Sequence, residues 1–201
     1  MSSNSSNNNN DGMSILCGET WHWDSRDENQ ITFHKDGTGE LICRAELNVW
    51  IAAEFDWKLL GLGSAGSAGV AKSRGCCGPS DSHDLLPSAS QFQLEITLSK
   101  RRIPALGGAR MDQYKINEAL LRDAAFAPKK YAVALEAGEF VTQFDARSRE
   151  GSHLLPGTPR FRFRLSFEPA PYPRREDWVD PQGAPDAMRF WEWNQFCGRQ
   201  V

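Results

Sequence analysis

Apolar and polar side chains alternate with a period of two through most of the chain, which predicts β-strands. The alternation is most regular over residues 49–58, 92–99 and 160–168. Asp36-Gly37 lies between two further alternating runs and is a strong signal for a hairpin turn. In total, the pattern predicts strands at residues 18–23, 30–35, 40–45, 49–58, 92–99, 130–136, 139–144 and 160–168.

Eight consecutive strands joined by hairpins favour an antiparallel meander. Closing such a meander into a barrel removes the unpaired edges that would otherwise aggregate. Eight is also the number of strands whose interior just holds side chains or one small ligand. We therefore predict an all-β, eight-stranded antiparallel barrel, with a β-sandwich as the alternative.

Two segments lack any hydrophobic period. Residues 1–14 begin with a run of Ser and Asn, which cannot bury enough apolar surface to order itself, so we predict a disordered tail. Residues 61–90 are dominated by Gly, Ser, Ala and Pro and are interpreted as a flexible loop. Residues 15–201 are then expected to form a single domain.

Helical spacing occurs in two places. Within residues 103–128, Ile116 and Leu120 are spaced for one or two helical turns across a barrel end. A longer helix is predicted over residues 185–197, between Pro185 at its start and Gly198 just after its end. Because this segment is apolar around much of its circumference, we expect it to pack on the outer wall of the barrel.

The charge balance argues against nucleic acid as a partner. The 201 residues include 23 basic and 26 acidic side chains, for a formal charge of −3, whereas proteins that neutralise phosphates are usually basic. No apolar run approaches the roughly 18–20 residues that a membrane span needs. The N-terminus shows no secretory signal. We therefore expect a cytoplasmic protein without a nucleic-acid or membrane partner.

The five cysteines give no metal-binding pattern. Cys76 and Cys77 are adjacent, and with His83 they lack the C-x₂-C spacing of a zinc site. An odd number of cysteines without an export signal favours free thiols. We expect neither a metal nor a cofactor.

The opening of the chain resembles that of lipocalin-like (calycin) barrels. The resemblance rests on Gly18-Glu-Thr-Trp21, Ile31-Thr-Phe33 and Asp36-Gly-Thr-Gly39, although lipocalins favour G-x-W over the G-x-x-W found here. It implies that Trp21 seals the closed end of the barrel. The segments Glu46–Glu54 and Phe190-Trp-Glu-Trp193 are similar to those of uncharacterised fungal proteins of comparable size.

The resemblance implies three possible functions. Lipocalin-like barrels mostly bind hydrophobic small molecules, and we expect such a ligand inside this barrel. Some fungal relatives instead hold a polyketide or terpenoid intermediate of secondary metabolism and cyclise or isomerise it without a cofactor. The third possibility is a structural or interaction protein whose barrel is filled by its own side chains.

Aromatic residues are the candidates for contact with a ligand in the barrel. They are Trp21, Phe33, Phe55, Trp57 and Phe163. Aromatic side chains offer large apolar surfaces for stacking, but they would touch a ligand only if they line a void.

The candidate catalytic residues are Glu54 and His34. Residues 49–58 allow two interpretations, because a change of one residue in register exchanges the two faces of a strand. In the first, Glu54 and Asp56 lie outside and Trp50 is covered by the C-terminal helix. In the second, Glu54 points into the barrel, where burial would raise its pKa and suit general acid–base chemistry.

Three arginines alternate with phenylalanines over residues 160–168. If the phenylalanines face inward, Arg160, Arg162 and Arg164 form an outward row. Such a row either binds an anionic ligand or pairs with acids across the sheet, with Glu95 and Glu136 as the candidates.

Overall fold

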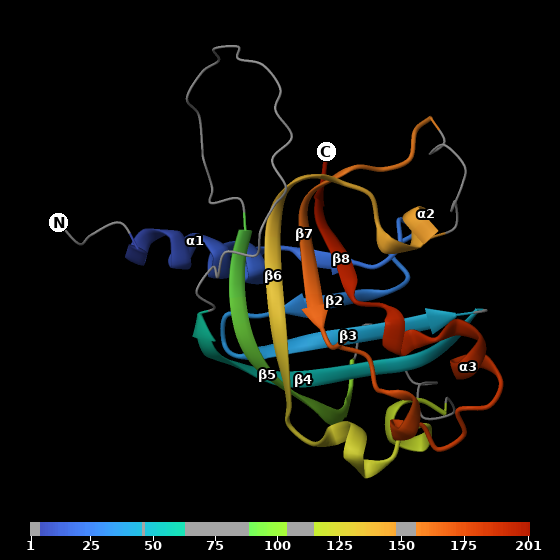
Figure 1. Cartoon of the computed structure of the whole chain (residues 1–201). Helices are drawn as coiled ribbons and strands as arrows, with labels where there is room; N and C mark the ends of the chain where they lie inside the picture. The colour runs from blue at the N-terminus through green and yellow to red at the C-terminus, as the bar shows by residue number, and fades with distance from the viewer. Residues whose placement is uncertain (1–4, 46, 63–88, 104–114, 148–155) are drawn as a thin grey trace, which may run out of the picture.

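The computed structural model describes residues 5–45, 47–62, 89–103, 115–147 and 156–201. Eight antiparallel strands close into a barrel in chain order (Figure 1), which confirms the predicted fold class. The strands are β1 (Thr20–His22), β2 (Gln30–Phe33), β3 (Thr38–Ala45), β4 (Asn48–Leu62), β5 (Ala89–Arg102), β6 (Lys129–Phe140), β7 (Phe161–Glu168) and β8 (Gln195–Gln200). The helices are α1 (Ser5–Gly18), α2 (Gln143–Arg147) and α3 (Ala184–Met188), with 3₁₀ turns η3 (Asn117–Ala119), η4 (Asp123–Phe126), η5 (Arg175–Asp177) and η6 (Phe190–Glu192).

The period of two in the sequence becomes the inside and outside of the barrel. In β7, Phe161, Phe163, Leu165 and Phe167 are buried, whereas the residues between them are exposed or half-buried. Figure 1 shows β5–β8 running at a steep angle to β2–β4. The core lies between these two layers.

The count of eight strands is correct, but one strand was placed wrongly. The sequence predicts separate strands at 130–136 and 139–144, with a turn at Ala137-Gly138 between them, but this turn does not form and β6 runs on as far as Phe140. A register shift between Ala137 and Phe140 against β7 accommodates these residues within the ladder. The segment predicted as a separate strand at 139–144 therefore ends β6 and leads into α2.

The missing strand is found at the C-terminus. The helix predicted over 185–197 is present only as the five residues of α3, because Arg189 adopts a left-handed conformation (φ 51°) that ends it. Gln195–Gln200 then forms β8, in which Cys197 pairs with Arg164 of β7 and His22 of β1. By pairing with β7 and β1, β8 satisfies the backbone groups at the edges of these two strands. A helix on the surface would leave those edges unpaired.

Helix α1 covers one end of the barrel and includes residues 5–14 of the tail that we predicted to be disordered. Leu16 is fully buried, and its carbonyl accepts a hydrogen bond of 3.0 Å from Nε1 of Trp21. A Cβ atom on Gly12 would lie 2.9 Å from the ring of Phe92. These contacts order the helix. Residues 1–4 lie outside the described part of the chain.

The other end of the barrel is covered by the segment between β7 and β8. Tyr172 donates a hydrogen bond of 2.9 Å from its hydroxyl to the carbonyl of Ile42 in β3. Trp193 stacks on Trp23 with 3.6 Å between ring centroids. These contacts fix the path of the chain between β7 and β8.

The helical turns predicted within 103–128 are present as η3 and η4. Asn117 of η3 is fully buried, and its side-chain amide both accepts from and donates to the backbone of Ala52, at 2.8 Å in each case. Of the loop predicted at 61–90, residues 61–62 end β4 and 89–90 begin β5, and the remainder lies outside the described residues.

Candidate functional site

The aromatic residues proposed as ligand contacts lie in the barrel core and pack against one another. The ring of Phe33 lies 5.3 Å from that of Phe55 and 5.4 Å from that of Trp57, both edge-to-face. Phe163 is 2% exposed, and Trp21 is buried beneath α1. Four of the five residues are thus buried core side chains, and Trp57 is half-buried with Nε1 donating to the carbonyl of Thr38.

A series of ring contacts continues along the interior to the other end of the barrel. Phe33 stacks on Phe167 at 6.3 Å, and Phe167 meets Phe196 at 5.7 Å. Tyr172 then links Phe196 to Trp193, with centroid distances of 6.0 and 5.7 Å. Aromatic side chains therefore contact one another along the length of the barrel interior.

Neither catalytic candidate lies in the interior. Glu54 is on the outer face of β4, where its carboxylate accepts a hydrogen bond of 2.6 Å from Arg101. The first interpretation of residues 49–58 is therefore correct for Glu54 and Asp56, which lie outside. Trp50 shares this outer face and packs against Trp178 and Phe190 rather than against a long C-terminal helix.

His34 is exposed in the turn that follows β2. Its backbone carbonyl accepts from Nε1 of Trp57 at 3.2 Å, so its described contacts are made by the main chain. The structure does not bring His34 and Glu54 together on one face, since one lies in a turn and the other on the outer wall.

The outward arginine row is largely paired with acids. Nη2 and Nε of Arg164 both donate to Oε2 of Glu136 across the ladder, at 2.8 and 2.9 Å. Arg160 lies 3.7 Å from Glu139. Glu95, the other candidate partner, pairs instead with Lys58 at 2.7 Å. The row thus stabilises the outer face of the sheet.

The cysteines of the described residues are free and unsuited to nucleophilic chemistry. Burial raises the pKa of Cys43 well above its ordinary value and that of Cys197 to about 12, so both remain thiols. Within the described ranges no group of three or more His, Cys, Asp or Glu side chains could hold a metal ion. Cys76, Cys77 and His83 lie outside these ranges.

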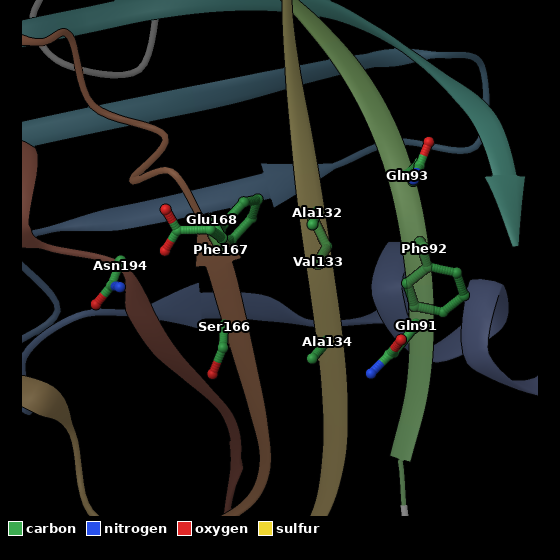
Figure 2. Close-up of a pocket in the computed structure, with 10 residues that line it drawn as sticks. All are labelled: Gln91, Phe92, Gln93, Ala132, Val133, Ala134, Ser166, Phe167, Glu168 and Asn194. Atoms are coloured by element: carbon green, nitrogen blue, oxygen red, sulfur yellow. The ribbon is translucent and has the colours of Figure 1, made fainter. Parts of the chain in front are cut away.

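A groove runs across the outer face of β5, β6 and β7 (Figure 2). Its floor contains two alanines of β6, and the register of the sheet sets larger polar residues on both sides. Ala132 lies opposite Gln93 and Glu168, and Ala134 lies opposite Gln91 and Ser166. The groove has a volume of about 340 Å³.

The walls of the groove offer both donors and acceptors of hydrogen bonds. Gln91, Gln93 and Glu168 are exposed and Ser166 is half-buried, so all four can reach a bound molecule. Asn194 closes one end. Oδ1 of Asn194 accepts from Gln143 at 3.0 Å, which fixes the amide and leaves its N–H groups as donors.

The sequence contains a signal for this groove that its interpretation missed. Ala132 and Ala134 occupy the outward positions between the inward residues Tyr131, Val133 and Leu135. Two small residues on the polar face of a strand predict a shallow depression. Which residues form its walls depends on the pairing register, which only the folded sheet reveals.

Comparison with protein-family models, with curated proteins and with solved structures gives no match to this chain. Among the helices of the described ranges, none has the length and apolar character needed to cross a membrane. The groove and the chemistry of its walls are therefore the features of the molecule that indicate a function.

Proposed function

We propose that the protein binds a small molecule with an apolar face and a polar edge, in the groove over Ala132 and Ala134. The main support is that two alanines form an apolar floor, and the neighbouring strands present polar side chains at the positions paired with these alanines. Pockets for small molecules combine mainly apolar walls with a few polar groups, and their volumes begin near about 300 Å³. The groove fits this description.

The composition of the groove supports binding rather than the isomerase or cyclase reaction. Glu168 is the single ionisable side chain among the ten that line it. General acid–base chemistry ordinarily requires a positioned donor and acceptor of protons, so one exposed carboxylate is insufficient. The groove lies on the outer face of the sheet, whereas the sequence led us to expect a site in the barrel interior. The aromatic residues expected to line that interior site contact one another.

The wider assignment to lipocalin-like barrels is part of this proposal. It is supported by the closed antiparallel meander and by a helix that covers the barrel end containing Trp21. The likeness to fungal proteins rests on the sequence segments Glu46–Glu54 and Phe190–Trp193.

The groove can be filled without disturbing the core. In Ala134→Gln the longer side chain would occupy the floor, and we expect binding of the neutral apolar probe N-phenyl-1-naphthylamine to weaken at least about tenfold. Fluorescence titration measures the affinity. Ala137→Gln is the matched control, because Ala137 is an exposed alanine of the same strand outside the groove.

Two outcomes would contradict the proposal. If the wild-type protein does not enhance the fluorescence of the probe, the groove does not serve as an apolar site. If Ala134→Gln binds the probe as tightly as Ala137→Gln, the probe lies elsewhere, and the barrel interior becomes the next site to test.

A further inference from the structure

A second, chemically different pocket lies at the barrel end formed by the start of β6 and the chain after β7. Its volume is about 260 Å³, and it is lined by Tyr131, Tyr172, Lys129, Arg174 and Asp177 together with Pro169, Ala170 and other residues. It shares no lining residue with the groove of Figure 2.

The hydroxyl of Tyr131 has no hydrogen-bond partner among the described residues. The side chain is 6% exposed, and its ring packs edge-to-face on Phe167 at 6.3 Å, which holds it at the mouth of the interior. Tyr172, on the opposite wall, donates its hydroxyl to the carbonyl of Ile42. The hydroxyl oxygen of Tyr131 is not among the described side-chain atoms that are buried without a partner, so it is open to the pocket and can donate to a bound molecule.

Charged groups of both signs lie around this hydroxyl. Nζ of Lys129 lies 2.5 Å from Oδ2 of Asp177, and the same carboxylate accepts the backbone N–H of Arg174 at 3.0 Å. Both contacts are made to Oδ2 of Asp177, and the ion pair offsets the charge of Lys129. The guanidinium of Arg174 has no carboxylate partner within the described part of the chain. With Lys130 and Glu176 included, the lining carries three cations against two carboxylates.

We propose that this pocket binds the carboxylate of a small organic acid. The Tyr131 hydroxyl donates to one oxygen, Arg174 supplies charge-assisted donors, and Pro169, Ala170 and the ring of Tyr172 contact the apolar part of the acid. Burial raises the pKa of Tyr131 to about 12, so the phenol remains a protonated donor near neutral pH. The mixture of apolar walls and one open cationic side favours an organic carboxylate over inorganic phosphate.

Benzoate is the probe for this site, and its affinity can be measured by isothermal calorimetry on the full chain. We expect Tyr131→Phe and Arg174→Ala each to weaken benzoate binding at least about tenfold. Arg175→Ala is the matched control, because Arg175 lies on the same turn but is paired with Asp186. Tyr131→Phe should unfold at the same temperature as the wild type or higher, since it removes an unpaired hydroxyl.

Neutral and inorganic probes complete the test. Benzamide, which has the same ring without the charge, should bind more weakly than benzoate, and inorganic phosphate should not compete with benzoate. The proposal is overturned if the wild type does not bind benzoate, if Tyr131→Phe binds it equally well, or if benzamide or phosphate binds as tightly. Ala134→Gln should leave benzoate binding unchanged, so this test and that of the groove can fail independently.

Discussion

Gly39 lies where strand β3 passes directly over the core. A Cβ atom at this position would be 2.3 Å from the ring of Phe55 and 2.4 Å from the backbone carbonyl of Thr32. The carbonyl belongs to the paired neighbour β2 and has little freedom to move, and Phe55 is fully buried. A side chain here would force the strands apart.

We therefore expect Gly39→Ala to lower the free energy of unfolding by about 3 kcal/mol, at the upper end of the usual cost of overpacking. Urea denaturation measures the change. Gly61→Ala is the control, because nothing lies within 4 Å of a Cβ atom there. Equal midpoints for the two variants would show that β3 can move away from Phe55.

At the scale of elements, Leu16 is the fully buried side chain among residues 11–18 of helix α1. It lies at the barrel end, and its carbonyl accepts a hydrogen bond from the indole of Trp21. Met13, Ile15 and Cys17 are partly buried and pack against the same core. We therefore expect the removal of the Leu16 side chain to loosen the helix.

Leu16→Ala should destabilise the protein by about 2–5 kcal/mol, the range for removing a buried leucine. The change can be followed by thermal unfolding, and hydrogen exchange over residues 5–18 should become faster. Ser14→Ala, an exposed position of the same helix, provides the comparison. Unchanged exchange in Leu16→Ala would mean that α1 is held by other contacts.

At the scale of the whole molecule, the buried tyrosines limit stability at high pH. Burial raises the pKa of Tyr131 to about 12 and raises that of Tyr172 well above its ordinary value. The unfolded chain ionises its tyrosines near pH 10, so between about pH 10 and pH 12 it binds fewer protons than the folded chain. The free energy of unfolding therefore falls as the pH rises through this window.

For Tyr131 alone the loss amounts to roughly 2 kcal/mol by pH 12, because each pH unit between the two pKa values costs about 1.4 kcal/mol and the folded-state group is itself half ionised at pH 12. Tyr131→Phe should keep more of its stability at alkaline pH than the wild type does. Urea denaturation at neutral and alkaline pH measures the difference, and the ultraviolet absorbance of phenolate reports ionisation. Parallel losses in the two proteins would show that Tyr131 ionises freely in the folded state.

The strand pattern could be predicted from the sequence because the period of two is local. Phe161 to Phe167 alternate with polar residues, and any sheet that buries one face requires this arrangement. Positions such as Gln195–Gln200 could not be assigned in this way. Their strand exists because the edges of β7 and β1 need a partner, and those edges meet only once the barrel has formed.

The candidate site was less predictable for the same reason. The sequence shows that Ala132 and Ala134 face outward, but only the register places Gln93 and Glu168 beside Ala132. Likewise, it shows many aromatic residues at inward positions without showing whether they surround a void. Their ring contacts form because strands that are far apart in the sequence lie close together in the folded barrel.

The sequence by itself determined the β-class, most strands, the inward and outward faces of regular strands such as β7, and the turns around η3 and η4. Each depends on neighbouring residues along the chain, where hydrophobic periodicity acts directly. The tertiary structure decided the identity of the eighth strand, the mutual packing of the interior aromatic residues, and the groove and pocket on which the functional proposals rest. These depend on contacts between distant segments, and a contact of that kind is fixed only when the whole barrel closes.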